Sequence, residues 1–194
     1  MKRLFDFIAS SIGLIFLSPL FLLISLLIKL SSKGPVLFRQ KRVGKNGIVF
    51  TLIKFRSMAV EQENNSTISV KGDIRITPFG KFIRRFKLDE LPELWNVLVG
   101  EMSMVGPRPD VPGFADLLEG ESRLILNLRP GITGPASLKY ANEEEMLAEI
   151  ANPEEYNKNV IFPDKVRINL DYYHRQNIWL DLKIIFATIF RTNY

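Results

Sequence analysis

An apolar stretch near the beginning of the sequence constrains the fold more than any other feature. Residues 4–30 include eighteen Leu, Ile or Phe residues in 27. Each such residue at the centre of a membrane helix contributes about −0.3 to −0.6 kcal/mol, so the stretch outweighs the roughly 3 kcal/mol cost of its one internal proline. The sequence therefore predicts that this segment enters a membrane.

Basic residues flank the apolar stretch, with Lys2 and Arg3 before it and a basic cluster after it. A straight span would place one flank outside the cell, against the rule that positive charge stays inside. Pro19 would break the helix in the middle, and the Ser18 hydroxyl can satisfy a freed carbonyl. Each half would be about 20 Å long, shorter than the ~30 Å hydrocarbon core. We predict a re-entrant hairpin over residues 1–33 with both ends in the cytoplasm; a kinked single span is the open alternative.

The composition limits the chemistry that the chain can perform. Its 194 residues, 46% of them hydrophobic, can bury one good core, which predicts a single domain over residues 34–194. There is no Cys and His174 is the only His, which excludes disulfides, thiolate zinc sites and a Cys nucleophile. A metal would have to be a hard ion held by carboxylates, for which Mg²⁺ is the best candidate. The net charge of +5 indicates an anionic partner: a phosphate-bearing substrate, a lipid surface or nucleic acid.

A β-hairpin is expected after the membrane segment. Residues 34–44 and 47–58 read as two short strands joined by a turn at residues 45–47. Alternation along the second strand places Lys54 and Arg56 on one face. This pair binds phosphate if the face lines a pocket, and belongs to an ordinary solvated face if it does not.

Two adjacent carboxylates, Asp89 and Glu90, stand at the start of a predicted helix. The apolar residues that would form its buried stripe recur at helical spacing: Leu88, Leu91, Trp95 and Leu98. Because Pro92 is tolerated only in a first turn, Asp89 would lie at or near the N-cap, where free N–H groups keep a carboxylate ionised. An ionised carboxylate suits a nucleophile or a metal ligand. The alternative is a plain helix cap beside a solvated charge.

Basic residues are expected to surround this carboxylate pair. Thr77 predicts the start of a short helix that carries Arg84 to within a few residues of Asp89, where cations would lower carboxylate pKa values. Arg108 stands between two prolines, so its guanidinium is presented with little entropy left to lose; a rigid surface turn is the alternative. In residues 129–134, glycines allow backbone N–H groups to converge on an anion.

The remaining segments show no catalytic pattern. Residues 61–67 read as a polar loop, and residues 143–150 as an exposed amphipathic helix and not a metal site. Residues 166–190 are predicted to form a helix on the lipid headgroup layer; a core-packing helix is the alternative. His174 has no motif around it and is predicted to lie at the surface or at an interface.

Seven motifs, in order along nearly the whole chain, resemble those of the monotopic phosphoglycosyl transferases of bacteria, the polyprenyl-phosphate sugar-1-phosphate transferases. They are Ser18-Pro19, Lys54-Phe55-Arg56-Ser57-Met58, Arg75-Ile76-Thr77, Leu88-Asp89-Glu90-Leu91-Pro92, Met102-Ser103 with Gly106-Pro107-Arg108-Pro109, Arg129-Pro130-Gly131-Ile132-Thr133-Gly134, and Leu180-Asp181-Leu182-Lys183. The resemblance implies a re-entrant membrane helix, an Asp-Glu dyad, Mg²⁺, a nucleotide-diphosphate sugar donor and an undecaprenyl phosphate acceptor.

The same resemblance implies roles for individual residues. Asp89 would be the nucleophile that attacks the sugar-linked phosphate, expels UMP and forms a phosphosugar-aspartyl intermediate, and it would also contact the metal. Glu90 would assist the attack of the lipid phosphate or position the metal. The candidate substrate-binding residues are Lys54, Arg56, Arg84 and Arg108 for the phosphates, Arg129, Gly131 and Thr133 for the nucleotide, and Asp171, which resembles a family carboxylate near the site.

Two departures from the family pattern bear on the site. Lys87 stands where such proteins often have a small hydroxyl residue, which affects one contact to the dyad. After Gly134 the chain runs through an acidic segment to Pro163, unlike the more usual pattern. Because the choice of sugar can depend on that region, the sugar is not assigned from the sequence.

The fold expected from these features is α/β in the α+β sense: a mostly helical compact domain with a short β-hairpin, a re-entrant membrane helix-break-helix and amphipathic interfacial helices. The expected function is transfer of a sugar 1-phosphate from a UDP-sugar to undecaprenyl phosphate by a monotopic enzyme at the cytoplasmic face of the bacterial inner membrane. The expected partners are these substrates and membrane lipids, with a homodimer left open and nucleic acid not expected. The alternative is a non-catalytic membrane-anchored scaffold or a module that binds anionic lipid.

Overall fold

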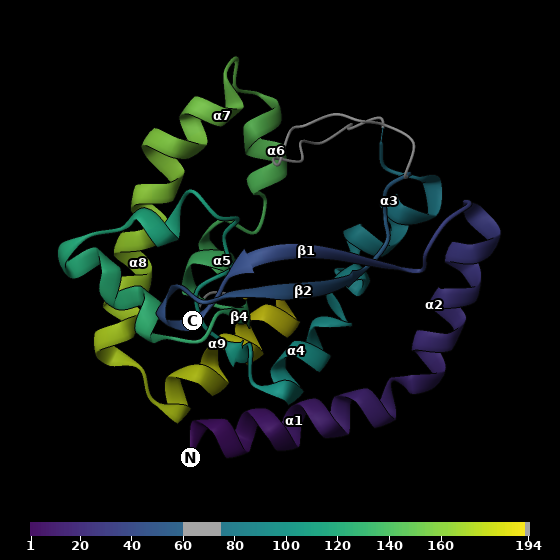
Figure 1. Ribbon diagram of the computed structural model, residues 1–194, viewed down its shortest axis with the longest axis horizontal. Helices are drawn as coiled ribbons and strands as arrows, with labels where there is room; N and C mark the ends of the chain where they lie inside the picture. Colours follow the sequence, from purple (N-terminus) through teal and green to yellow (C-terminus); the bar gives the residue numbers. More distant parts are fainter. Residues whose placement is uncertain (60–74, 193–194) are drawn as a thin grey trace.

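The computed structural model describes residues 1–59 and 75–192 as a mostly helical chain with two small sheets (Figure 1). Residues 61–67, predicted to form a polar loop, lie outside the described residues. The first half contains α1 (Lys2–Phe16), α2 (Ser18–Ser31), β1 (Leu37–Val43), β2 (Val49–Phe55), α3 (Pro78–Arg85), a 3₁₀ turn (Leu88–Glu90), α4 (Glu93–Val99) and β3 (Ser103–Val105). The second half contains 3₁₀ segments (Ala115–Leu117 and Gly120–Asn127), β4 (Gly131–Thr133), α5 (Pro135–Lys139), α6 (Glu143–Ala148), α7 (Pro153–Tyr156), a π-helical turn (Asn157–Ile161), α8 (Phe162–Arg175) and α9 (Ile178–Phe190).

The predicted helix break at Ser18 and Pro19 is confirmed. α1 and α2 meet at an angle of 60°. Pro19 lies in the first turn of α2, and the Ser18 hydroxyl donates to the carbonyl of Ile15 at 2.8 Å, which satisfies a carbonyl freed by the break. Among the described residues, no single helix has the length and apolarity to cross a membrane, but the bent pair taken together does by these two measures.

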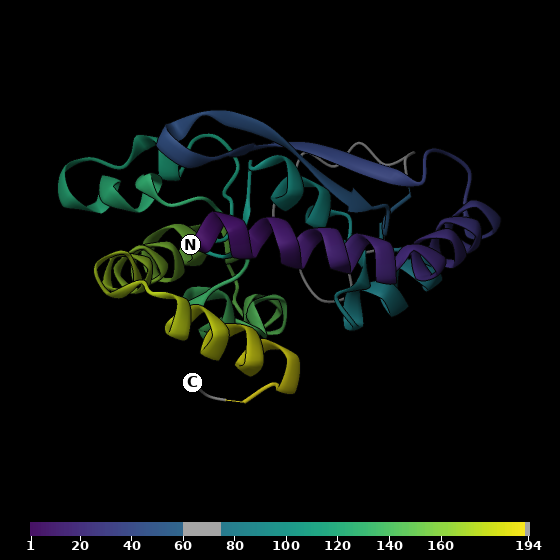
Figure 2. The same ribbon diagram turned by 90° about the horizontal axis from the view of Figure 1, so that it is seen from below.

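The beginning of α1 is tied to the centre of the domain. The Arg3 guanidinium donates to the carbonyls of Val97 and Leu98 at the end of α4, at 2.6 and 2.7 Å. The buried carboxylate of Asp6 accepts from the hydroxyl of Ser103 at 3.0 Å and from the backbone of β3. Figure 2 shows α1 lying lengthwise across the folded domain.

The second half of the hairpin shares a core with the domain. Ile24 and Ile28 of α2 are buried against Phe55 and Ile83. The Arg56 guanidinium lies at the end of helix α2. It donates to the carbonyls of residues 32 and 33 at 2.8 and 2.5 Å. A cation at the C-terminal end of a helix is favourable, so Arg56 fixes the end of the hairpin.

The predicted β-hairpin is confirmed. β1 and β2 pair antiparallel, with Phe38 opposite Lys54 and Val43 opposite Val49. The connecting turn at Lys45–Gly47 contains Asn46 with φ 58° and Gly47 with φ 77°, and both residue types tolerate this left-handed conformation. Lys54 is therefore at the end of the hairpin away from the turn.

The predicted buried stripe of the dyad helix is confirmed only in part: Leu88 and Leu91 pack against the core that α2 shares with the domain, but both precede the helix. α4 begins only at Glu93, and its buried residues are Glu93, Leu94, Asn96 and Val97, whereas Trp95 is 51% exposed. The reason is that Asn96 binds the backbone of β2: its amide donates to the Thr51 carbonyl at 2.8 Å and accepts from the N–H of Ile53 at 3.1 Å. Satisfying these backbone groups turns the polar face of α4 inward.

The C-terminal helix predicted over residues 166–190 is two helices. α8 ends at Arg175 and α9 begins at Ile178, where the side chain of Asn177 accepts from the N–H of Leu180 at 3.0 Å. This N-cap gives the second helix its own start. The predicted cap of α3 is confirmed, because the Thr77 hydroxyl accepts from the N–H of Gly80 at 2.9 Å.

Candidate active site

Three carboxylates and a lysine meet where the end of β2 faces the start of α4. The ammonium of Lys54 lies 3.0 Å from Glu90 and 3.1 Å from Glu93. Asp89, Glu90 and Glu93 are all buried. The hairpin places Lys54 at this point, and the 3₁₀ turn places Glu90 before the helix that carries Glu93.

Arg108 completes the ring of charge around Glu90. Its guanidinium lies 2.5 Å from the same Glu90 oxygen that Lys54 contacts. The flanking backbone is fixed by hydrogen bonds, since the Pro107 carbonyl accepts from Gly131 at 2.8 Å and the Pro109 carbonyl from Arg42 at 3.1 Å. The Arg108 side chain remains 42% exposed. A phosphate can therefore reach Arg108 without displacing Glu90.

The carboxylate of Asp89 differs from those of its neighbours. Its Oδ1 atom is buried and has no hydrogen-bond partner in the described part of the chain. Asp89 lies in the first turn of the 3₁₀ segment, whose N-cap is Lys87 with φ 56°, so it is near an N-cap, as predicted, but is not the cap residue of α4. A buried oxygen without a partner costs roughly 1–3 kcal/mol, which is kept in folded proteins mainly where function requires it.

The environment separates the pKa values of the three carboxyls. Burial and the charge of Glu90 raise the pKa of Asp89, so the predicted lowering of this pKa is wrong. Burial alone would raise the pKa of Glu90, but Arg108 and Lys54 outweigh it and hold that pKa well below its usual range. Burial raises the pKa of Glu93 to about 7, against the opposing charge of Lys54. Glu90 is thus the permanently ionised member, and Asp89 is the more basic member of the dyad.

Arg84 approaches the dyad from α3. Its charge acts on Asp89 and lowers the pKa of that carboxyl, although burial outweighs this effect. Its guanidinium also makes an ion pair with Glu144 of the acidic helix α6. The helix predicted to be merely exposed therefore brings a carboxylate to a cation of the site.

Lys54, Arg84 and Arg108 are thus brought together as predicted, while Arg56 and Asp171 are placed elsewhere. Arg56 is used to hold the end of α2, as described above. Asp171 is exposed on α8 and pairs with Arg175 one turn away at 3.1 Å. An exposed i, i+4 pair explains Asp171 without any role at the dyad.

In the loop over residues 129–134, the N–H of Gly131 is engaged within the protein and is not open to an anion. The N–H of Gly131 donates to Pro107, and the Thr133 carbonyl accepts from Gly106 at 2.9 Å, because β4 pairs parallel with β3. A Cβ on Gly131 would lie 2.1 Å from the Gly106 nitrogen, so this glycine permits close strand approach. Arg129 donates to the Gly100 carbonyl at 2.9 Å. Gly131 and Thr133 thus hold the backbone that precedes Arg108.

Sequence reasoning missed Glu93 as a member of the site. No motif assigned a role to Glu93, whereas the structure buries it against Lys54. The spacing of four residues between Asp89 and Glu93 was the available signal. The prediction for His174 agrees with the structure, where its side chain is 52% exposed.

The donor set fits one contact to Mg²⁺ rather than a cage. Among the described residues, no group of three His, Cys, Asp or Glu side chains is arranged to hold a metal. Mg²⁺ needs only one or two protein carboxylates when substrate phosphates and water supply the remaining ligands. The unpartnered Oδ1 of Asp89 is such a carboxylate oxygen, since Glu90 and Glu93 are already paired with cations.

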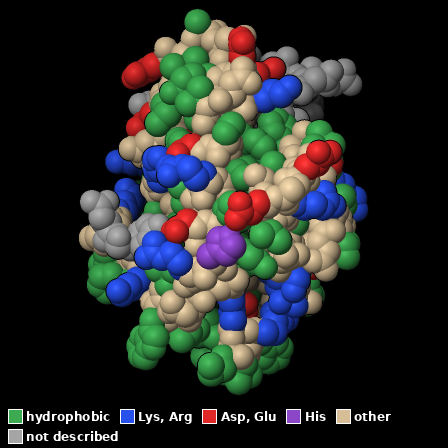
Figure 3. Space-filling model, turned by 90° about the vertical axis from the view of Figure 1, so that its left-hand side faces the viewer, with side chains coloured by type: hydrophobic (Ala, Val, Ile, Leu, Met, Phe, Trp, Pro, Cys, Tyr) green, Lys and Arg blue, Asp and Glu red, His purple; other side chains and the backbone are tan. Residues whose placement is uncertain are grey.

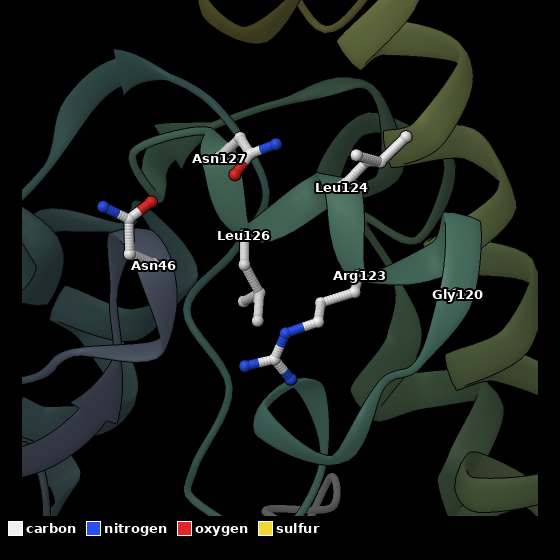
Figure 4. Close-up of a pocket in the computed structure, with 6 residues that line it drawn as sticks. All are labelled: Asn46, Gly120, Arg123, Leu124, Leu126 and Asn127. Atoms are coloured by element: carbon white, nitrogen blue, oxygen red, sulfur yellow. The ribbon is translucent and has the colours of Figure 1, made fainter.

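A surface cavity of about 300 Å³ lies far from this cluster, at the turn end of the hairpin (Figure 4). Asn46, Arg123 and Asn127 line it together with a glycine and two leucines. None of the predicted site residues borders this cavity. The geometry therefore favours the dyad, and not this hollow, as the place of chemistry.

A buried carboxylate oxygen without a hydrogen-bond partner, close to a lysine and two arginines, suits chemistry on a phosphate group. The family described as bacterial sugar transferase matches residues 1–193. The chain belongs to this family.

Relatives with named activities support this membership. The chain is 42% identical over 196 residues to the UDP-glucose:undecaprenyl-phosphate glucose-1-phosphate transferase of Klebsiella pneumoniae, covering 98% of this chain and 39% of that protein. It is 38% identical to the UDP-N-acetylgalactosamine-undecaprenyl-phosphate N-acetylgalactosaminephosphotransferase of Aeromonas hydrophila, covering 97% and 43%. It is 34% identical to the exopolysaccharide production protein ExoY of Rhizobium meliloti, covering 97% and 83%. The chain therefore spans less than half of the first two relatives and most of the third.

Proposed function

We propose that the protein transfers a sugar 1-phosphate from a UDP-sugar to undecaprenyl phosphate and releases UMP. The names of the relatives from Klebsiella and Aeromonas state a transfer of this type, with a UDP-sugar as donor and undecaprenyl phosphate as acceptor. The observation that carries the proposal is the buried, unpartnered Oδ1 of Asp89 beside the Glu90–Arg108–Lys54 cluster. The two relatives differ in the sugar that they name, so the sugar is left open.

In the first step, an Asp89 oxygen attacks the phosphorus that carries the sugar. The bond between this phosphorus and the oxygen of UMP breaks, UMP leaves with the electron pair, and a sugar-phosphoryl-aspartyl intermediate forms. The raised pKa of Asp89 makes its carboxylate a better nucleophile than an ordinary aspartate, provided that it is ionised. Arg84 and Arg108 reduce the repulsion between this anion and the diphosphate.

In the second step, a phosphate oxygen of undecaprenyl phosphate attacks the same phosphorus. The bond to Asp89 breaks, and the product is the sugar joined to the lipid through a diphosphate. Glu90 stays ionised because its pKa is held low, so its role is to position Lys54 and Arg108 rather than to deliver a proton. Splitting the transfer into two displacements lets one fixed carboxylate serve both substrates in turn.

Asp89 is also the proposed contact of Mg²⁺, together with the donor phosphates. When bound, the ion would neutralise charge on the diphosphate and on the leaving UMP. Lys54, Arg84 and Arg108 act on the same charge from the protein side. Omitting the metal should therefore slow UMP release without unfolding the protein.

The proposed location is the cytoplasmic face of the bacterial inner membrane, with residues 1–33 as a re-entrant hairpin and residues 34–194 as the catalytic domain. Many large apolar residues of the hairpin are exposed: Leu4, Phe7, Ile8, Ile12, Ile15, Phe16, Leu22, Leu23, Leu26 and Leu30. Figure 3 shows hydrophobic side chains gathered at the lower edge of the molecule, the edge along which α1 runs in Figure 1. An anchor of this kind would hold the dyad at the height of the lipid phosphate.

The nucleophile is tested with Asp89→Asn in the detergent-purified protein, incubated with a UDP-sugar, undecaprenyl phosphate and Mg²⁺. We expect UMP release to fall by at least 1000-fold, because an amide cannot form the acyl phosphate. The matched control is Asp171→Asn, an exposed aspartate away from the dyad. Incubation of the unaltered protein with radiolabelled donor alone should yield a label on Asp89.

The alternative is a non-catalytic scaffold or lipid-binding module. It predicts no UMP release with any UDP-sugar, no dependence on Mg²⁺, and salt-sensitive binding to anionic vesicles that is unchanged by Asp89→Asn. Normal turnover by Asp89→Asn would contradict the nucleophile assignment while leaving the transferase class intact.

A further inference from the structure

Asp110 is an acidic residue held rigidly beside the proposed site. It follows Pro109, two residues after Arg108. Its backbone carbonyl accepts from the N–H of Val43 at 2.8 Å, and the preceding carbonyl accepts from Arg42 at 3.1 Å. Both bonds attach this segment to the end of β1, so the position of Asp110 relative to Arg108 is fixed.

The side chain of Asp110 has no partner of its own. It is half-buried, and within residues 1–59 and 75–192 its carboxylate makes no hydrogen bond and no ion pair. Burial raises the pKa of Asp110 to about 6, although Lys165 and Arg42 act in the opposite direction. A carboxylate left in this way can accept hydrogen bonds from a ligand.

Charged side chains of both signs act on Asp110 from helix α6, helix α8 and strand β1. Lys165 of α8 and Glu143 of α6 pair with each other, with both Glu143 oxygens 2.7 Å from the lysine nitrogen. The charges of this pair, of Arg42 and of Arg108 all act on Asp110. Asp110 thus belongs to a charged cluster, formed with Glu143, Lys165, Arg42 and Arg108, that contains both hydrogen-bond donors and acceptors.

The mixed charges of this cluster determine which kind of chemical group it can bind. A phosphate would meet the carboxylates of Asp110 and Glu143, and a divalent cation would meet three basic side chains. Neutral hydroxyl groups avoid both repulsions, because each can donate to a carboxylate and accept from a cation. Two residues of extended chain span at most about 7 Å, so such a group would be close to a phosphate bound by Arg108.

We propose that Asp110, together with the Lys165–Glu143 pair, forms a subsite that binds hydroxyl groups of the UDP-sugar donor. This inference rests on the proposed transferase function. The hydroxyls belong either to the sugar ring or to the ribose, which present the same chemistry. The subsite includes the acidic segment after Gly134, since Glu143 lies within it.

The experiment measures KM and kcat for UMP release with UDP-glucose in the unaltered protein and in Asp110→Asn. We expect KM to rise about tenfold, because a hydrogen bond to a charged acceptor is weakened, while kcat changes less than threefold. Glu119→Gln is the matched control, an exposed carboxylate without an ion pair in the described residues. An unchanged KM in Asp110→Asn would overturn the subsite.

Deoxy donors distinguish the two sources of hydroxyls. If the subsite binds the sugar, removing one sugar hydroxyl should raise KM in the unaltered protein and have no further effect in Asp110→Asn. If the subsite binds the ribose, UDP-glucose that lacks the ribose 2′- or 3′-hydroxyl should show this pattern instead. Either non-additive result supports the subsite. Independent, additive effects for every deoxy donor would contradict it.

A binding measurement keeps this inference separate from catalysis. Calorimetry compares UDP-glucose binding to Asp89→Asn and to the double variant Asp89→Asn with Asp110→Asn, neither of which has to turn over. Weaker binding by the double variant supports the subsite even if the nucleophile assignment fails, and equal binding refutes it. If Asp110→Asn melts at a lower temperature than the control, Asp110→Ser, which also removes the carboxylate, takes its place, with the same expected rise in KM and the same contradiction if KM is unchanged.

Discussion

Glu93 illustrates at the residue scale how the site places charge inside the protein. It is 2% exposed and shares Lys54 with Glu90, which is the more strongly held partner because it also contacts Arg108. Two carboxylates beside one lysine cannot both be fully compensated. The protein resolves this conflict by raising the pKa of Glu93 to about 7, which burial favours.

Stability should therefore depend on pH through Glu93. Its ordinary pKa is 4.5, so the folded state gains stability from the proton below pH 4.5 and loses it as the pH rises through about 7. Glu93→Gln has no such loss, and relative to the unaltered protein it should gain up to about 3 kcal/mol between pH 4.5 and pH 8. Melting temperatures of both proteins in detergent across this range provide the measurement, with Glu119→Gln as the control. A difference that is flat with pH would contradict the prediction.

The sequence allowed the dyad to be located but not its electrostatics. Asp89, Glu90, Lys54 and Arg108 were found from charge, spacing and motif resemblance. The direction of the Asp89 pKa shift was predicted wrongly, because it depends first on burial in the folded protein. A helix-cap argument uses only the neighbouring residues, and here the helix starts four residues later, at Glu93.

At the scale of elements, the acidic helix α6 occupies a cation that the proposed function assigns to the donor phosphates. Glu144 pairs with Arg84, whose charge acts on Asp89. A donor phosphate that approaches Arg84 therefore meets a carboxylate already present. Such a contact favours the empty site over the occupied site.

Glu144→Gln should strengthen donor binding. The ion pair is partly exposed, so its loss should lower the KM for the donor by about two- to fivefold and leave kcat within twofold. Steady-state kinetics at low salt provide the measurement, and high salt should shrink the difference. Glu149→Gln, an exposed residue just after α6, is the control. A higher KM in Glu144→Gln would show that Glu144 assists binding rather than opposing it.

Elements with local signals were predictable, and those set by distant contacts were not. The Thr77 cap, the Asn46-Gly47 turn and the Ser18-Pro19 break each depend on a few consecutive residues. The parallel pairing of β3 with β4 joins residues 103–105 to residues 131–133, and no periodicity in three-residue strands announces it. For the same reason, the hydrogen bond from the Gly131 N–H to Pro107 could not be predicted from the sequence.

At the scale of the whole molecule, both ends of the hairpin attach to one domain. Lys2, at the start of α1, forms an ion pair with the buried Asp181 of α9. At the other end, the carbonyls of Ser32 and Lys33 accept from Arg56. In the proposed membrane-bound state, these contacts would keep both ends of the hairpin on the same side of the membrane as the domain.

The two ends of the hairpin are predicted to face the same side of the membrane. A cysteine at position 33 and a cysteine added before Met1 should both react with a membrane-impermeant thiol reagent only when the cytoplasmic side is opened; the native chain has no Cys to interfere. The added residue is preferable to Lys2→Cys, which would remove the ion pair with Asp181. A straight span would expose one of the two labels on the periplasmic side of intact cells, and such labelling would contradict re-entry. Repeating the experiment in Ser18→Ala with Pro19→Ala tests the cause: if the break sets the topology, part of the population should move one label to the periplasm, because the removed proline allows the helices to join.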